Sequence, residues 1–316
     1  MQRYKLVSEI PNLFGYFQKM PYLCTTMRKK LLFAILGMMA IISCNSKGQT
    51  RPADSKDSVA VDTIAPETSD DFRKDSLKTD TLSYSKEEGK YSFNLLADYP
   101  VEGDDTLVKV VRRYINDFLG GAYDGSLDDG KAMIKKNGEI MYGNFVEMCG
   151  DADLEDVSEL YYYKSVERGC ETNAFITFMT SGGHYTGGLH GIGFETGVTF
   201  SKSNGKTFGY DMMKGIDSPE FKRFIKEGLR KYFSTEGQEP ISDDDLLQEL
   251  VSYSGSIDEL PLPDSEPYLT EKGVKFVYQP YEISYYAAGK PEFTIPYAAI
   301  RPYLTPQAVK LFLNNR

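Results

Sequence analysis

The chain has 316 residues, with 36 Lys and Arg against 46 Asp and Glu, which gives a net charge of −10. This length allows one or two domains with a hydrophobic core. The acidic balance argues against a nucleic-acid partner, because nucleic acids bind basic surfaces. Only two His and four Cys residues are present, which limits imidazole and thiol chemistry.

The first 43 residues resemble a secretion signal. They hold six basic residues and one acidic residue, so residues 44–316 hold 30 basic and 45 acidic residues, a net charge of −15. Basic residues 28–30 precede the apolar run 31–42, which is shorter than the ~20 residues that span a membrane. Met27 is a natural start, so residues 1–26 are interpreted as a gene-start artefact, with a long n-region or a cytoplasmic stub as the alternatives.

The end of the apolar run, Ile41-Ile42-Ser43-Cys44, resembles the lipobox of bacterial lipoproteins. In those proteins the cysteine is acylated and the signal is removed before it, and several acyl chains hold a protein firmly on a membrane. We therefore expect lipid attachment at Cys44 and a location in the cell envelope, periplasmic or associated with the outer membrane. An ordinary cleaved signal, with Cys44 as a chance thiol, is the alternative.

Residues 44–89 are rich in Asp, Ser, Thr and Lys, and their apolar residues follow no helix or strand period. Such a composition buries too little apolar surface to offset the entropy lost on folding. We expect a disordered tether over this range.

An α+β domain is predicted from about Lys90 onward. A strand pattern at 91–95 precedes a helix that starts at Asp104 or Asp105 and ends at Gly120-Gly121. A less regular helix is predicted over 128–149, where Gly138 and Gly143 lower the helix propensity. The elements predicted next are strands at 160–166, 173–180 and 193–200 and a hairpin turn at 203–206.

The C-terminal part alternates helices with further strands. Ser218 and Ser242 are predicted N-caps of two helices, the first beginning at Pro219. The later elements predicted are a loop at 256–267, strands at 273–286 and 292–296, and a short helix around Ala308. Such blocks favour an α+β fold of mixed or antiparallel sheets with packed helices over a doubly wound sheet. We expect two consecutive half-domains, 90–181 and 182–316.

The segment 181–191 is the most unusual part of the chain, because it holds both histidines and five of the 28 glycines. A metal site would combine the histidines with Glu195 or Asp211, but their spacing on a glycine-rich turn matches no recognised ligand pattern. We expect a structural loop, with ligand contact as the alternative, and neither a metal nor another cofactor. The residues concerned are His184, Gly187, Gly188, His190 and Gly191.

Other chemistry has little support in the sequence. No Gly-x-Ser-x-Gly elbow occurs, and 45 acidic residues offer too many accidental carboxylate pairs to choose one. Secretion makes a disulfide between Cys149 and Cys170 the expected pairing, with a Cys–His site as the alternative. The many strand tyrosines suit half-buried sheet positions, although exposed ones could also stack on sugars or a partner protein.

Two separated motifs resemble the RsiV/PdaC-type extracellular domain family. Residues 187–191, Gly-Gly-Leu-His-Gly, are similar to its Gly-Gly-Ala-His-Gly signature, with Leu189 in place of Ala. Residues 276–297 are similar to its Tyr-Glu-Ile, Tyr-Ala-x-Gly and Ile-Pro pattern. The resemblance implies an α+β fold of two halves, found in a lysozyme-sensing anti-sigma factor and beside the catalytic domain of a peptidoglycan deacetylase.

The resemblance carries over no catalytic residue. It implies a non-catalytic, lipid-anchored binding module of the cell envelope, whose partner is a lysozyme-like protein or peptidoglycan. The alternative is a cell-wall hydrolase or deacetylase-like enzyme that uses the glycine- and histidine-rich loop 182–191.

Overall fold

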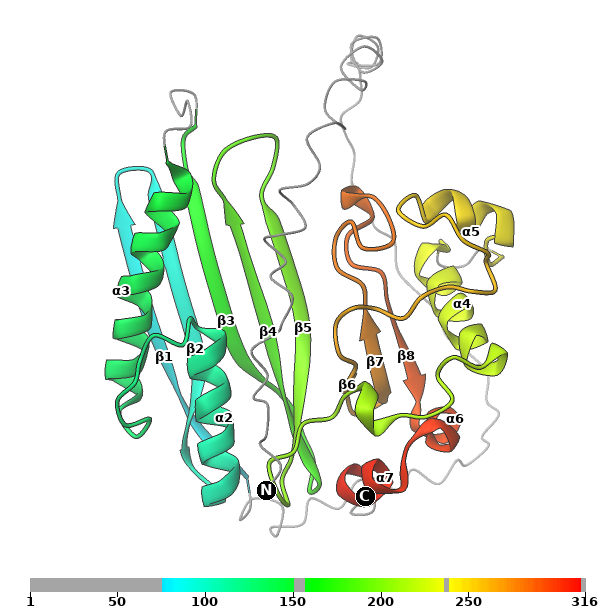
Figure 1. Cartoon of the computed structure of the whole chain (residues 1–316), viewed down its shortest axis with the longest axis horizontal. Coiled ribbons are helices and arrows are strands. Elements are labelled where there is room, and N and C mark those ends of the chain that lie inside the picture. The colour runs from blue at the N-terminus through cyan, green and yellow to red at the C-terminus, as the bar shows by residue number, and fades with distance from the viewer. Residues whose placement is uncertain (1–75, 151–156, 236–238, 314–316) are drawn as a thin grey trace, which may run out of the picture. The chain divides into compact units, whose positions relative to one another are not determined.

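The computed structural model describes residues 76–150, 157–235 and 239–313, all within the unit Pro66–Arg316. These residues form an α+β fold with six α-helices, a five-stranded mixed sheet and a three-stranded antiparallel sheet (Figure 1), which confirms the predicted fold class. The predicted signal segment and Cys44 lie outside the described residues. In the three described ranges, no helix combines the length and the apolar character needed to cross a membrane.

The larger sheet has the strand order β1-β2-β3-β4-β5. All neighbouring strands are antiparallel except β2 and β3, which are parallel because the chain crosses between them through two helices. The strands are β1 (Lys78–Glu88), β2 (Tyr91–Glu102), β3 (Leu160–Glu171), β4 (Phe175–Tyr185) and β5 (Ile192–Ser201).

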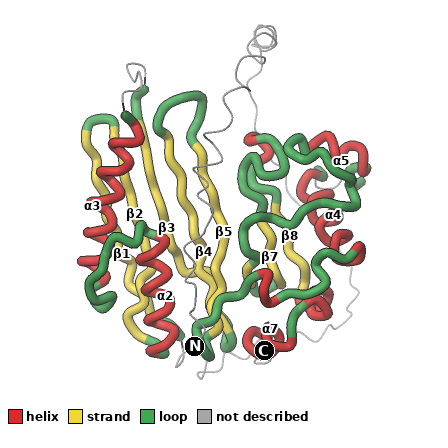
Figure 2. Tube along the Cα trace, viewed as in Figure 1, coloured by secondary structure: helices red, strands yellow, loops and turns green. Residues whose placement is uncertain are grey.

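Helices α2 (Asp105–Phe118) and α3 (Gly130–Cys149) cover one face of this sheet (Figures 1 and 2). The Asp104 carboxylate accepts hydrogen bonds from the first backbone N–H groups of α2, as the sequence predicts. Asp129 caps α3 in the same way. The strand residues that point to the helices form the first core with them, including Phe93, Leu95, Val166, Phe178 and Phe200.

The smaller sheet, of order β6-β7-β8, belongs to a second core built with the remaining helices. Ser218 and Ser242 each cap a helix, which confirms both predicted N-caps. The elements are α4 (Pro219–Phe233), α5 (Asp243–Glu249), β6 (Tyr268–Leu269), β7 (Gly273–Val277), β8 (Glu292–Pro296), α6 (Tyr297–Ile300) and α7 (Pro306–Phe312).

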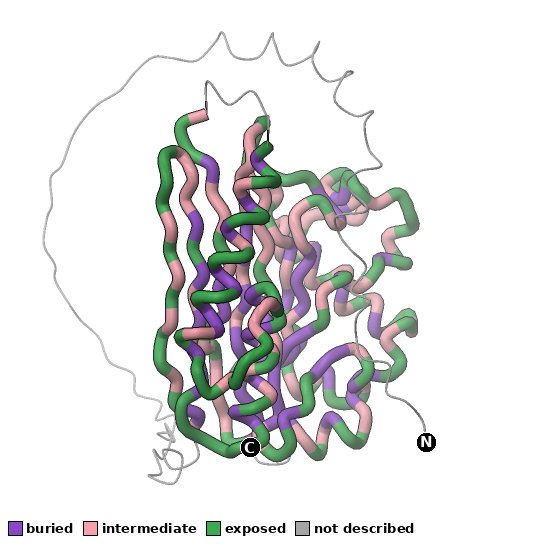
Figure 3. The backbone as a smooth tube through the Cα atoms, turned by 60° about the vertical axis from the view of Figure 1, so that its left-hand side comes forward, coloured by how far each residue is buried: buried purple, intermediate pink, exposed green. Residues whose placement is uncertain are grey.

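Strand β6 joins the two sheets by packing on the face of β4 and β5 that α2 and α3 leave uncovered. The Thr177 hydroxyl donates to the Leu269 carbonyl at 2.8 Å, and the Leu269 N–H donates to Thr199 Oγ1 at 2.9 Å. Gly197 makes room for the Tyr268 ring, which a Cβ at that position would approach to 2.6 Å. Figure 3 shows the buried segments concentrated along the strands. On β1 to β3, this same face carries mainly polar side chains, with Thr81, Asn94 and Glu167 exposed, and we call it the open face of the sheet.

The predicted tether is wrong over Lys78–Glu88, because these residues form β1. The strand lies at the edge of the sheet, and only Leu82 and Tyr84 pack against the first core. Two apolar residues in eleven are too few to give a strand period in the sequence. Just upstream, the Leu77 side chain is fully buried in the same core.

Two predicted boundaries also differ from the structure. The division at 181/182 falls inside β4, and the five-stranded sheet continues to Ser201. The strand predicted over 273–286 ends at Val277. The chain leaves the sheet there because the Glu282 carboxylate accepts the Gln279 N–H at 2.6 Å and closes a turn.

The predicted disulfide between Cys149 and Cys170 is not formed. Cys149 is buried in the first core, where burial raises the pKa of its thiol. Cys170 packs against the second core, and its thiol lies 3.5 Å from the Leu269 carbonyl. The two sulfur atoms therefore belong to different cores.

Candidate functional site

The glycine- and histidine-rich loop meets the loop between β7 and β8 at His190. The His190 Nδ1 atom lies 2.7 Å from the Gly191 carbonyl oxygen. A carbonyl oxygen only accepts, so Nδ1 carries a proton and donates it. In the neutral ring, Nε2 then accepts from the Tyr281 hydroxyl, 3.0 Å away. The two motifs that carry the family resemblance are thus in direct contact.

Exposed side chains surround this contact. The His190 ring stacks on Tyr286 with ring centroids 4.0 Å apart, and Tyr281 lies 5.6 Å from Tyr286. Tyr281 and Tyr286 are 44% and 37% exposed, and neighbouring Leu189 is 95% exposed. We call Leu189, His190, Tyr281 and Tyr286 the His190 cluster. Large apolar side chains gathered at an exposed position are typical of a binding surface.

The loop that carries Tyr281 is held in one conformation. Tyr281 has a φ of 71°, the one positive φ outside glycine in the described parts of the chain. Such strain persists only where the surroundings enforce it. The Glu282 carboxylate accepts N–H groups from Gln279 and Asp264, both at 2.6 Å, and burial raises the pKa of this carboxyl group. The Gln279 side chain bonds the backbone N–H and carbonyl of Glu195, which fastens the loop to β5.

His184 does not join this cluster. Its ring stacks on Tyr162, 6.3 Å away, on the helix-covered side of the sheet, and burial lowers its pKa. Glu195, one carboxylate considered for a metal site, instead pairs with Lys290 at 2.5 Å. In the described parts of the chain, no three His, Cys, Asp or Glu side chains gather as metal ligands would.

Two tyrosines lie next to the His190 cluster on the open face of the sheet. Tyr161 and Tyr163 are two positions apart on β3, so their side chains lie on the same face of the sheet, with ring centroids 6.4 Å apart. Their rings extend over glycines of the neighbouring strands and of the loop. We call Tyr161, Tyr163 and these glycines (Gly183, Gly191 and Gly193) the tyrosine platform. The sequence shows the tyrosines and the glycines separately, but only the strand register brings them together.

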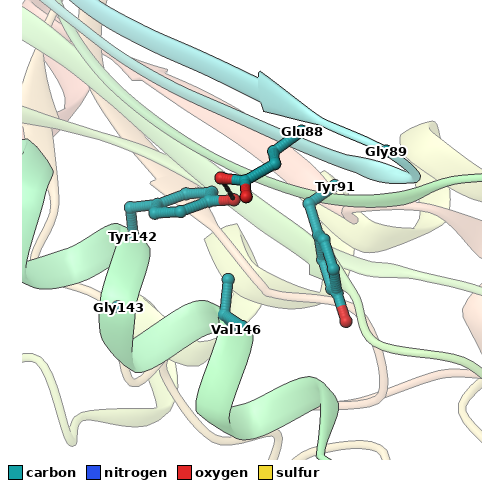
Figure 4. A pocket seen from close by; sticks show the side chains of 6 residues that line it. All are labelled: Glu88, Gly89, Tyr91, Tyr142, Gly143 and Val146. Atoms are coloured by element: carbon teal, nitrogen blue, oxygen red, sulfur yellow. Dashed lines mark hydrogen bonds between the residues drawn. The ribbon is translucent and has the colours of Figure 1, made fainter.

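A separate surface hollow of about 530 Å³ lies between the β1–β2 turn and α3 (Figure 4). The Tyr142 hydroxyl donates to the Glu88 carboxylate at 3.2 Å, and Lys86 pairs with the same carboxylate at 3.1 Å. The Lys86 ammonium also lies 3.9 Å from the centre of the Tyr142 ring. These three side chains satisfy one another, so they leave no group poised to act on a ligand.

The comparisons with known proteins give one family match. Residues 216–298 match the model of a family described as "Protein of unknown function (DUF3298)". This segment is therefore similar to members of that family. The matched segment contains Tyr281 and Tyr286 and begins after His190, so the His190 cluster combines side chains of this segment with side chains that precede it.

Two solved structures share the fold of the chain. A DUF3298 family member from Bacteroides fragilis has a TM-score of 0.52 and 19% identity, over 74% of this chain and 96% of that one. A DUF3298 family protein from Pseudomonas aeruginosa has a TM-score of 0.51 and 15% identity, over 75% and 97%. No curated protein matches the chain. The RsiV/PdaC resemblance and lipid attachment at Cys44 stay predictions.

Proposed function

We propose that the chain is a non-catalytic, lipid-anchored binding module of the cell envelope, and that the His190 cluster binds a cationic, lysozyme-like protein. The observation that carries this proposal is the protruding apolar group of Leu189, Tyr281 and Tyr286.

The side chains of the cluster suit a protein partner. Aromatic residues dominate the binding energy of protein interfaces, and an aliphatic side chain that protrudes can fill a pocket of the partner. Burying Leu189 would contribute about 1.5–3 kcal/mol. The loop that carries Tyr281 is already held by Glu282 and Gln279, so binding orders little additional chain there.

The charge of the chain favours a cationic partner. Residues 44–316 carry a net charge of −15. Such a field speeds the encounter with a cationic protein, and salt screens it. The affinity for lysozyme should therefore fall as the ionic strength rises.

The contacts of His190 favour binding over catalysis. Its ring nitrogens bond the Gly191 carbonyl and the Tyr281 hydroxyl, neither of which is a carboxylate that would orient a general base. A hydrolase of the serine or cysteine type needs a nucleophile within hydrogen-bond reach of the imidazole. This arrangement supports the binding module over the hydrolase or deacetylase-like alternative.

The test is binding of lysozyme to the immobilised chain between about 20 and 500 mM salt. We expect binding at low salt that weakens with salt, and a loss of at least roughly tenfold in Leu189→Ser. Val251→Ser is the matched control, because Val251 is also exposed, at 61%, but lies outside the cluster. Absence of lysozyme binding at low salt would sink the proposal.

Two further results would redirect the proposal. If only peptidoglycan sacculi sediment with the chain, and Leu189→Ser abolishes this, the partner is the wall and not a protein. If the chain releases reducing ends or acetate from peptidoglycan, and His190→Ala stops this while remaining folded, the enzyme alternative holds.

A further inference from the structure

The tyrosine platform has a geometry that differs from that of the His190 cluster. A Cβ at Gly183 on β4 would lie 2.8 Å from Tyr163 Cε1, and one at Gly193 on β5 would lie 3.4 Å from Tyr163 Oη. The Tyr163 ring therefore starts on β3, crosses β4 and reaches β5. A ring that spans two neighbouring strands lies along the sheet and does not stand upright from it.

Tyr161 lies down in the same direction. A Cβ at Gly191 would overlap the Tyr161 hydroxyl, so this ring reaches the start of β5. The two rings are inclined by 31° to each other. Three glycines thus leave space for two tyrosine rings, which explains why small residues recur in this part of the sequence.

One ring face remains open to solvent. Tyr163 is 39% exposed, whereas its inner face rests on the glycine backbone. In the strand register, Asn94 and Ser92 of β2 lie beside Tyr163 and Tyr161 on the same face, on the side of β3 away from the strands that the rings cover. An exposed aromatic ring that carries its own hydroxyl combines stacking with hydrogen bonding.

This combination suits a sugar ring. The faces of a pyranose carry C–H groups that meet the negative face of an aromatic ring, and its rim carries hydroxyls for polar neighbours. A nucleic-acid base would also stack, but the acidic chain repels the phosphate backbone. A protein hot spot prefers a desolvated pocket or a protruding anchor, and the platform offers neither.

We propose that the tyrosine platform is a glycan-binding site, in which Tyr163 and Tyr161 stack against the pyranose rings of a polysaccharide chain. The inference rests on the proposed function in one respect, that the chain binds its ligand without converting it. The platform and the His190 cluster are different sets of side chains, so each site can be removed alone.

The experiment is calorimetric titration of the full chain with tetramers of N-acetylglucosamine and of glucose. We expect saturable binding of at least one tetramer and a loss of roughly tenfold in Tyr163→Ala. Tyr163→Phe keeps the ring, so its affinity should stay within about threefold of the unmodified chain. Tyr285→Ala is the matched control, because Tyr285 is 41% exposed and its hydroxyl bonds Glu249, away from the platform. It should bind as the unmodified chain does.

Three results would overturn the inference. The first is the absence of saturable binding for both tetramers. The second is unchanged affinity in a folded Tyr163→Ala variant. The third is a loss of lysozyme binding in Tyr163→Ala without any glycan binding, which would make the platform part of a protein interface.

The failure of either proposal is distinguishable from the failure of the other. Glycan binding that survives Leu189→Ser, with no lysozyme binding, supports the platform and removes the protein partner. Lysozyme binding that needs Leu189, with no glycan binding, does the reverse.

Discussion

Replacing either of two glycines of α3 by alanine should change stability in opposite directions. Gly138 lies against β1, where a Cβ would overlap the Tyr84 ring at Cγ and Cδ1. Gly143, five positions further along the same helix, has no atom within 4 Å of the place of its Cβ. The chemical change and the helix are the same in both variants, so the difference isolates packing.

At each position, the gain in helix propensity is compared with the cost of overpacking, and the larger of the two decides whether the free energy of unfolding rises or falls. Alanine favours a helix over glycine by about 1 kcal/mol, partly through the unfolded chain. At Gly143 nothing opposes this gain, so Gly143→Ala should stabilise by up to about 1 kcal/mol. At Gly138 the overlap reaches the root of the Tyr84 ring, which cannot simply swing aside. Overpacking costs about 1–3 kcal/mol. Displacing the ring from its edge contact with Phe93, 6.1 Å away, adds about 0.5–1.5 kcal/mol.

We therefore expect Gly138→Ala to lower the free energy of unfolding by about 1–3 kcal/mol, despite its better helix propensity. Urea unfolding followed by far-ultraviolet circular dichroism measures both variants, with equal m-values as the check on the comparison. Each kcal/mol should also move the melting temperature by about 2–4 °C. A Gly138→Ala variant as stable as the unmodified chain, or a destabilised Gly143→Ala, would refute the close approach of α3 to β1.

Two further predictions concern buried charge. Only 5% of the Glu171 side chain is exposed, and its carboxylate accepts the Leu77 N–H at 3.2 Å and pairs with Lys202 at 2.9 Å. Glu171→Gln should lower the free energy of unfolding by about 3 kcal/mol, measured by urea unfolding, and an unchanged midpoint would contradict the ion cluster. Burial holds the His184 pKa below 6.5, so the unfolded chain takes up this proton first as the pH falls. Stability should therefore fall as the pH drops below 6.5, and His184→Phe, which keeps a ring against Tyr162, should flatten the decline; an equally steep pH profile would argue against this role.

The elements that the sequence predicts correctly are those with a local signal. Asp104, Ser218 and Ser242 cap helices at the predicted places, because a side-chain oxygen next to a helical pattern is a local interaction. Strand β1 has no such signal, because an edge strand needs few apolar residues. The end of β7 depends on Glu282, whose bonds to the turn could not be foreseen from strand propensity.

The candidate site was only half visible in the sequence. Composition pointed to His190, but its partner Tyr281 lies 91 positions away and is brought to it by the second sheet. The tyrosine platform depends on register, because Tyr163 meets Gly183 only when β3 and β4 pair in one alignment. The disulfide prediction was wrong because cysteine count and compartment do not reveal which core each thiol enters.

The buried Glu171 carboxylate, which pairs with Arg168 and Lys202, also has a mechanical consequence. Ser76 and Leu77, where the described chain begins, are held by Glu171 and Arg168 at the start of β1. The His190 cluster and Tyr161 lie at the opposite end of the sheet, since Tyr161 pairs with Ser92 and Ser92 with Glu87, near the end of β1. A tension applied between an anchor upstream of Ser76 and a ligand at that far end runs parallel to the strands. Such a load shears the β1–β2 hydrogen bonds all together and does not peel them one at a time, so the sheet resists it best along this axis.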